Sequence, residues 1–229
     1  MRKSLLKAPA ALLIAAACVC PAAAAVGGSR RAHGRHGHHH GFADARRWAA
    51  AFDAPDRDAW QKPGEVIAAL GIRPGLSVAD VGAGTGYFAV RLASAVAPGG
   101  VVYAEDVEPG MLRWLRDRAD KEGLSNIVPV LGSAGEPRLP PGSCGLVLIV
   151  DTWHHLEDRV GYARKLKSAL KPGGRVAVVD FKTGKLPVGP PPAMKLSPQT
   201  VESEFRAAGY RMASPPRMLT YQYILVFGT

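Results

Sequence analysis

The sequence predicts a single α/β domain with a mostly parallel sheet and helices on both faces. Short apolar runs alternate with helical patterns along the chain, as in a sheet whose strands are joined by helices. A glycine-rich turn joins the first of these runs to the helix that follows it. The 229 residues, 47% of them apolar, suffice for one large core but not for a second full domain.

Residues 1–25 have the pattern of a signal peptide. A basic start precedes the apolar run Ala8–Val19, and small residues end the segment at Ala22–Ala25. The run is too short for a comfortable membrane span, so we expect no permanent one. The protein is therefore expected to be exported, periplasmic or secreted. Lipoprotein anchoring at Cys18 is less favoured, because no large apolar residue stands three positions before it.

Residues 26–43 are expected to form a disordered linker. They hold five of the seven histidines and almost nothing that could be buried. Neutral imidazoles bind metals, so this tail could capture a metal adventitiously. We predict no metal site, because the histidine spacing is loose and no carboxylate or thiol lies nearby. An expression tag is a further alternative, although Gly and Arg interrupt the histidines.

The formal net charge of +10 overstates the basicity of residues 44–229. Six of the 29 basic residues lie before residue 36, which leaves 23 against 19 acidic residues, a net charge of +4. No basic stripe with interleaved aromatics is present. We therefore expect no nucleic-acid partner, and we expect a monomer.

The domain begins with two predicted helices, Asp44–Phe52 and Pro63–Leu70. The second has Pro63 in its first turn and Gly71 just beyond its end. Trp60 lies in the segment between them. The sequence does not decide whether Trp60 packs on the core or contacts a ligand.

The stretch Leu76–Ala93 predicts a strand, a tight loop and a helix. Gly82, Gly84 and Gly86 permit positive φ and remove the Cβ atoms that would keep a ligand away from the backbone. Free N–H groups of such a loop and the helix N-terminus attract negative charge. A nucleotide-like ligand is the favoured interpretation, and a glycine turn without a ligand is the alternative.

The glycine spacing decides which ligand this is. A dinucleotide fingerprint that starts at Gly82 would need its third glycine at Tyr87, so a dehydrogenase ranks last. The run Asp80-Val81-Gly82-Ala83-Gly84-Thr85-Gly86 instead resembles motif I of class I S-adenosylmethionine-dependent methyltransferases. The resemblance implies S-adenosylmethionine as cofactor, bound by these motif residues: Asp80, Gly82, Ala83, Gly84, Thr85 and Gly86.

The resemblance also implies a fold and its division. Such enzymes have a Rossmann-like, seven-stranded, mostly parallel sheet with an antiparallel last strand and helices on both faces. Residues 44–72 would be an N-terminal helical lid over the cofactor, and residues 73–229 the Rossmann-like core.

The second strand, Val101–Asp106, ends in two acids. Asp106 lies 20 residues after Gly86, the distance at which a carboxylate reaches ribose hydroxyls in doubly wound sites. Alternation points Glu105 to the opposite face. By resemblance to the family's segment at this place, Asp106 is assigned to the ribose and Glu105 is the second choice. The helix Pro109–Glu122 follows.

The third strand, Ile127–Leu131, carries Pro129, which confines it to a sheet edge. Ser133 and Ala134 come next, where relatives often carry an aspartate that bonds the adenine amino group. The resemblance therefore implies adenine contacts from Ser133 and Ala134. A hydrogen bond between the Ser133 hydroxyl and the adenine edge would stabilise cofactor binding by roughly 1 kcal/mol less than a hydrogen bond to a carboxylate.

The fourth strand, Cys144–Val150, is almost wholly apolar, as a central parallel strand should be. Because ligands sit beyond the carboxyl ends of such strands, the residues after it should line the pocket between cofactor and acceptor. Asp151 joins the predicted cofactor site. His154 or His155 is a candidate general base, which Asp151 could orient. Pocket shaping without catalysis is the alternative.

The remaining elements complete the pattern. An amphipathic helix ends at Lys171-Pro172-Gly173-Gly174, a frequent companion of motif I, and a stiff proline-rich loop could wall an acceptor site. The elements expected here are a helix over 158–170, a strand over 175–180, a loop over 181–198, a helix over 200–208, and strands over 210–213 and 219–227.

The function predicted from these features is methyl transfer from S-adenosylmethionine by in-line displacement. The motif of amino-methylating nucleic-acid enzymes is absent from the sequence. Arsenite methylation uses several cysteines, whereas only Cys144 lies outside the predicted signal peptide, which leaves a small-molecule or lipid acceptor. The alternative is a non-catalytic S-adenosylmethionine- or nucleoside-binding protein, and a metal-binding protein that uses the His-rich tail is a third hypothesis.

Overall fold

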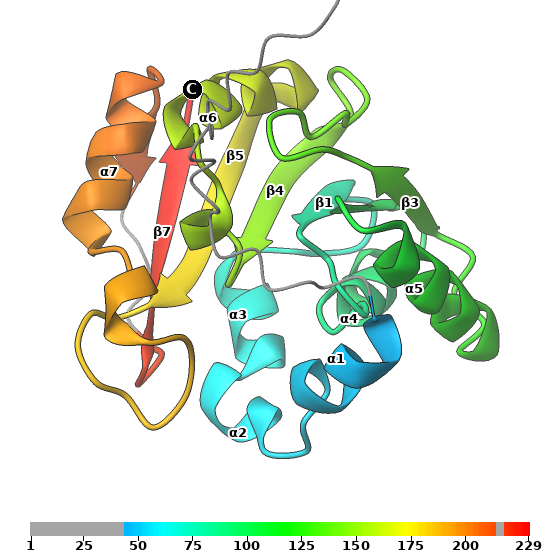
Figure 1. Ribbon diagram of the computed structural model, residues 1–229. Coiled ribbons are helices and arrows are strands. Elements are labelled where there is room, and N and C mark those ends of the chain that lie inside the picture. The colour runs from blue at the N-terminus through cyan, green and yellow to red at the C-terminus, as the bar shows by residue number, and fades with distance from the viewer. Residues whose placement is uncertain (1–43, 214–217) are drawn as a thin grey trace, which may run out of the picture. The chain divides into compact units, whose positions relative to one another are not determined.

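The computed structural model describes residues 44–213 and 218–229, which contain one seven-stranded sheet (Figure 1). The strand order is β3-β2-β1-β4-β5-β7-β6. All strands run parallel except β7, which is antiparallel to both β5 and β6. The predicted fold class is therefore confirmed. The strands are β1 (Val78–Val81), β2 (Val102–Asp106), β3 (Ile127–Leu131), β4 (Cys144–Val150), β5 (Leu170–Phe181), β6 (Arg211–Ala213) and β7 (Gln222–Gly228).

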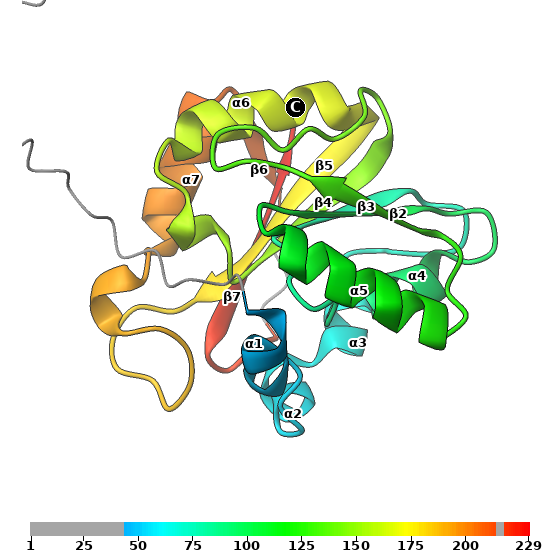
Figure 2. The same ribbon diagram turned by 45° about the vertical axis from the view of Figure 1, so that its right-hand side comes forward.

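Helices cover both faces of the sheet, as Figure 2 shows. One buried cluster joins the sheet to α3, α4 and α5, and a second joins the opposite face to α6 and α7. Short 3-10 turns, η1 (Trp153–His155) and η2 (Pro192–Met194), follow β4 and β5. The helices are α1 (Ala45–Phe52), α2 (Arg57–Gln61), α3 (Pro63–Ala69), α4 (Ala89–Val96), α5 (Pro109–Lys121), α6 (Arg159–Ala169) and α7 (Pro198–Ala207).

The central strand β4 shows why these residues form a parallel strand. Its apolar side chains alternate between the two clusters, with Leu146 and Leu148 in one and Val147 and Ile149 in the other. All four side chains are fully buried. Each buried aliphatic side chain stabilises the fold by about 1.5–3 kcal/mol relative to an exposed one.

The edge position predicted for the strand with Pro129 is confirmed. Among the described strands, β3 pairs with β2 alone, so the missing N–H of Pro129 disrupts no second ladder. Val128 and Leu131 remain 42% and 46% exposed.

The structure differs from the expected elements by more than two residues at three places. A short helix, α2, lies in the segment between the first two helices, where none was expected. β5 begins at Leu170 rather than Arg175, because Leu170 already pairs with Cys144 before a register shift. β7 begins at Gln222 rather than Leu219, and it is buried on both faces as expected.

The predicted signal peptide and His-rich linker fall within residues 1–43, outside the described part of the chain. Within residues 44–213 and 218–229, no helix is both long and apolar enough to cross a bilayer. The same residues contain no cluster of three or more His, Cys, Asp or Glu side chains suited to holding a metal ion.

Candidate functional site

The candidate site lies at the carboxyl ends of β1 and β4. These strands are neighbours in the sheet, yet β1 leads to α4 on one face and β4 leads to α6 on the other. Open α/β sheets bind their ligands at a reversal of this kind. The region between these two loops is called the crevice below. Figure 1 shows α1, α2 and α3 beside this end of the sheet.

The glycine loop after β1 packs tightly against other parts of the chain. A Cβ on Gly82 would collide with the Thr152 side chain, and one on Gly86 would lie 2.8 Å from Leu115 Cδ1. Both glycines also have positive φ, +73° and +90°. Phe52 of α1 covers Gly84, since a Cβ there would lie 3.3 Å from the Phe52 ring. The glycines therefore admit the protein's own side chains as well as any ligand.

Asp106 joins the end of β2 to the glycine loop. Its carboxylate accepts hydrogen bonds from the N–H of Gly84 at 2.8 Å and from the N–H of Glu108 at 2.9 Å. Burial raises the pKa of Asp106, while these two N–H groups act in the opposite direction. The carboxylate predicted to bind ribose is thus held rigidly beside the loop.

Glu105 points away from this carboxylate, as alternation predicted. The N–H groups of Gly82 and Ala83 donate to its carbonyl oxygen at 2.9 and 2.8 Å, and its side chain fills the space beside Gly132. Its Oε1 has no hydrogen-bond partner among the described residues. Burial, with the nearby charge of Asp106, raises the pKa of Glu105 to about 8.

Asp80 lies beneath the loop with one oxygen unused. The residue is 2% exposed, and its Oδ2 has no hydrogen-bond partner in the described part of the chain. Burial raises the pKa of Asp80 to about 7, although the charge of Arg57 lowers it. A buried carboxylate oxygen without a donor is costly, so it is suited to receiving a ligand donor or cation.

Ser133 and Ala134 follow β3, which is separated from β1 in the sheet by β2. The N–H of Ser133 donates to Glu136 O at 2.9 Å, and the N–H of Glu136 donates back at 3.1 Å. Ala134 is exposed and Ser133 is half-buried. These contacts fix the turn in which both predicted adenine residues lie.

Asp151 after β4 is the centre of a polar cluster. Gln61 Nε2 of α2 donates to its Oδ2 at 3.1 Å, and Gln222 Nε2 of β7 donates to its Oδ1. Arg57 Nη2 lies 3.4 Å from Oδ2. Burial raises the pKa of Asp151 to about 6, and Arg57 opposes that shift. Asp151 also has φ +54°, a backbone strain that is common at functional sites.

His154 is held by Asp180 rather than by Asp151. Its Nδ1 lies 2.9 and 3.0 Å from the two carboxylate oxygens of Asp180, at the end of β5. Both side chains are buried, at 3% and 0% exposure, and the N–H of Phe181 fixes Asp180 from the other side. His155 is exposed, with its ring centroid 4.2 Å from that of His154. His154 is thus the buried histidine of the pair, and a carboxylate orients its ring as expected of a base.

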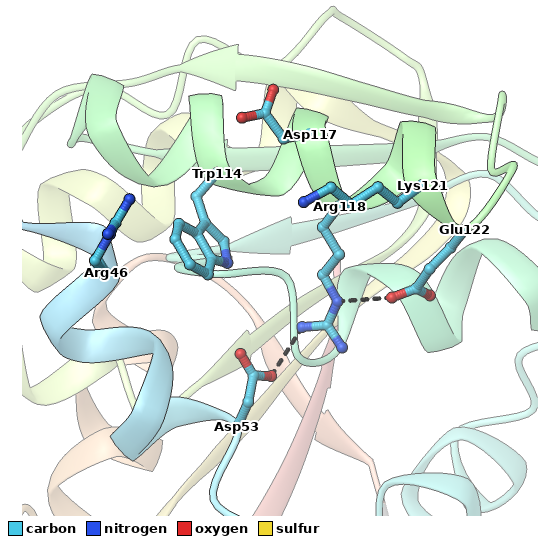
Figure 3. Close-up of a pocket in the computed structure, with 7 residues that line it drawn as sticks. All are labelled: Arg46, Asp53, Trp114, Asp117, Arg118, Lys121 and Glu122. Atoms are coloured by element: carbon cyan, nitrogen blue, oxygen red, sulfur yellow. Dashed lines mark hydrogen bonds and ion pairs between the residues drawn. The ribbon is translucent and has the colours of Figure 1, made fainter.

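A second polar contact ties the N-terminal helices to the glycine loop. Thr85 Oγ1 donates to Asp53 Oδ2 at 3.0 Å, and Arg118 Nη1 of α5 donates to Asp53 Oδ1 at 2.8 Å. Figure 3 shows the contact between Arg118 and Asp53, beside a cavity of about 550 Å³ between α1 and α5. No residue predicted to bind the cofactor lines it; the lining residues are Arg46, Asp53, Trp114, Asp117, Arg118, Lys121 and Glu122.

Similarity to known proteins identifies the family. The family profile described as "Methyltransferase domain" matches residues 78–174, from β1 into β5. A SAM dependent methyltransferase from Aquifex aeolicus is 26% identical, with a TM-score of 0.76 over 81% of this chain and 98% of that one. Residues 78–174 therefore form a methyltransferase domain, and the fold around them is that of the class I S-adenosylmethionine-dependent methyltransferases. The predicted family is confirmed.

The names of two curated relatives of this chain refer to quinones. The ubiquinone/menaquinone biosynthesis C-methyltransferase UbiE of Cupriavidus taiwanensis is 33% identical over 116 residues, 50% of this chain and 47% of that protein. The demethylmenaquinone methyltransferase of Listeria welshimeri is 28% identical over 128 residues, 56% and 53% of the two chains. The chain thus spans about half the length of the curated relatives it matches.

The residues present fit the cofactor that the family implies. The glycine loop, the fixed carboxylate of Asp106 and the unused Oδ2 of Asp80 lie around one strand end. Sequence reasoning missed Arg57, Gln61, Asp180 and Gln222. Asp180 had a signal, because it ends an apolar strand pattern at the sheet's carboxyl edge, whereas the other three reach the site only through the tertiary fold.

Proposed function

We propose that this protein transfers the methyl group of S-adenosylmethionine to a small-molecule or lipid acceptor by in-line displacement. The observation that carries the proposal is the pairing of Asp106 with the glycine loop, next to the buried, unpartnered oxygen of Asp80. A carboxylate for ribose hydroxyls and a second for a cationic group match an adenosyl sulfonium amino acid. The relatives' names support an acceptor of the quinone lipid type.

The cofactor, when bound, supplies an activated methyl group, so the chain's own task is mainly positioning. Asp106 would hold the ribose, while Ser133 and Ala134 would meet the adenine edge. The loop residues Gly82 to Gly86 would contact the rest of the cofactor, on the side toward β4.

His154 is the proposed general base for the acceptor. With the ring proton assigned to Nδ1, this N–H donates a hydrogen bond to the Asp180 carboxylate, which leaves Nε2 as the basic nitrogen of the ring. Nε2 would take the proton of the acceptor atom as that atom bonds to the methyl carbon and the carbon–sulfur bond breaks. Asp180 then acts as a positioning residue that also stabilises the imidazolium formed.

We further propose that the reaction takes place outside the cytoplasm. The support is the basic start, apolar run and small-residue end of residues 1–25. A net charge of +4 over residues 44–229 gives no reason to invoke nucleic acid as the acceptor.

Calorimetric titration tests the proposal most directly. S-adenosylmethionine and S-adenosylhomocysteine should bind the purified chain with micromolar affinity, and NAD should not bind. A lipid extract incubated with the chain and methyl-labelled cofactor should then yield a labelled product by mass spectrometry. Absence of binding by both adenosyl ligands would refute the proposed function; binding without any labelled product would favour a non-catalytic binding protein.

A further inference from the structure

The cavity between α1 and α5 is separate from the residues assigned to the cofactor and the acceptor. Its volume of about 550 Å³ lies within the size range of small-molecule sites. The lining comes from α1, from α5 and from the residue that follows each helix, Asp53 and Glu122. The proposed function gives this cavity no role.

Trp114 provides the cavity with an aromatic wall. Figure 3 shows its ring extending from α5 into the space between Arg46 of α1 and Arg118. The Trp114 side chain is half-buried, and its indole N–H donates to no acceptor in the part of the chain that the structure describes. An indole with one face open to a cavity is suited to stacking against a planar ring.

The lining also carries positive charge that no carboxylate engages. Arg118 pairs with Asp53 at 2.8 Å and with Glu122 at 2.9 Å. Arg46 and Lys121, by contrast, form no ion pair with any residue that the structure describes. Figure 3 shows these two cations on opposite sides of the Trp114 ring. An aromatic wall flanked by two unengaged cations favours a planar ligand that carries an anionic group.

One carboxylate connects this cavity to the glycine loop. Asp53 accepts a hydrogen bond from Arg118 in the cavity wall through Oδ1, and from Thr85 in the loop through Oδ2. Arg118 Nη1 also lies 3.3 Å from the carbonyl oxygen of Thr85. A ligand that draws Arg118 toward itself therefore changes the contacts of the buried Thr85 side chain.

We propose that this cavity is an effector site for a planar aromatic compound with one anionic group. The ring stacks on Trp114, and the anionic group pairs with Arg46 and Lys121. Asp117, the remaining acid of the lining, is exposed, so solvent screens its repulsion of the anion. Occupation of the site changes cofactor affinity through Asp53. The site itself does not depend on the proposed function, whereas its effect on the cofactor rests on it.

The test uses 8-anilinonaphthalene-1-sulfonate, an aromatic anion whose fluorescence reports binding to apolar protein surface. It is titrated into the full chain and into the Trp114→Ala and Lys121→Glu variants. Trp60→Ala and Lys171→Glu are the matched controls. Trp60 is half-buried and Lys171 is exposed, like the residues they are compared with, and neither lines the cavity.

We expect Trp114→Ala to weaken probe binding by at least about tenfold, because the stacking wall is lost. Lys121→Glu should weaken it by about three- to tenfold through charge reversal, and each control by less than about twofold. Equal probe affinity in the wild-type chain and Trp114→Ala would overturn the proposal. The proposal would also fail if the wild-type chain bound no probe, or if Trp60→Ala abolished binding, which would place the probe in the crevice.

A second titration tests the effect on the cofactor. Saturating probe should change the dissociation constant of S-adenosylmethionine by about fivefold in the wild-type chain, and by less than about twofold in Trp114→Ala and Asp53→Asn. An unchanged constant in the wild-type chain would overturn the effector role. A chain that binds the probe as expected but no S-adenosylmethionine would refute the proposed function and support the aromatic-anion site.

Discussion

The two sides of the crevice are held together by different kinds of contact. On the β1–β2 side, main-chain N–H groups of a glycine loop meet carboxylates that lie close by in the chain; Gly84 and Asp106 are 22 residues apart. On the β4–β5 side, side chains from distant elements meet one another; Gln61 and Gln222 are 161 residues apart. The first side is held by local backbone geometry and the second by the docking of α2 and β7.

This difference separates binding from turnover. A site made of backbone donors and fixed carboxylates suits a ligand whose shape does not change from one family member to another. A site made of side chains on separate elements can change its acceptor without disturbing the loop. We therefore expect substitutions on the β1–β2 side to change cofactor affinity and those on the β4–β5 side to change the methylation rate.

The largest effect should come from His154. His154→Ala should lower turnover by about 10²- to 10⁴-fold, because the base for the acceptor proton is lost. Cofactor affinity, measured by calorimetry, should stay the same. Asp180→Asn should lower turnover with the same selectivity, since it disturbs the tautomer of His154, and exposed His155→Ala serves as the control. Equal turnover in the His154 and His155 variants would show that His154 is not the general base.

A smaller effect is expected from Asp106. Asp106→Ala should weaken S-adenosylmethionine binding by roughly 1 to 3 kcal/mol, because charge-assisted hydrogen bonds to the ribose are lost. Turnover at saturating cofactor should change far less than in His154→Ala. The control is Asp117→Ala, which removes an exposed carboxylate of α5. Unchanged affinity in Asp106→Ala would show that the ribose lies elsewhere.

A third effect concerns the stability of the β1–β2 side rather than binding or turnover. The pKa of Glu105 is raised from its usual 4.5 to about 8, so this buried carboxyl favours the folded state when protonated. Its contribution is complete below about pH 4.5 and is lost as the pH rises toward about 8. Glu105→Gln should flatten the fall of the unfolding midpoint over this range, measured by denaturant titration at several pH values.

Glu65→Gln is the matched control, because the side chain of Glu65 is 59% exposed. A wild-type midpoint as flat as that of Glu105→Gln would contradict the buried, protonated carboxyl.

The elements on the β1–β2 side of the crevice could be predicted from the sequence more fully than the contacts on the β4–β5 side. The strand before Gly82, the edge strand with Pro129 and the apolar run of β4 all follow from local pattern, and the structure has them at the expected places. The place of Gln222 could not follow in this way, because it depends on which strands pair and in which direction. The α2 helix was missed because five residues carry too little periodicity to be recognised.

The antiparallel direction of β7 also determines where a label or support can be attached to the protein. Its first residue, Gln222, contacts Asp151 in the crevice, while Gly228 pairs with Arg175 at the opposite edge of the sheet. The final residue, Thr229, therefore points away from the crevice, as Figure 1 shows. A fusion partner, dye or resin attached through Thr229 would leave the crevice open to cofactor and acceptor, so immobilised binding assays should use that attachment point.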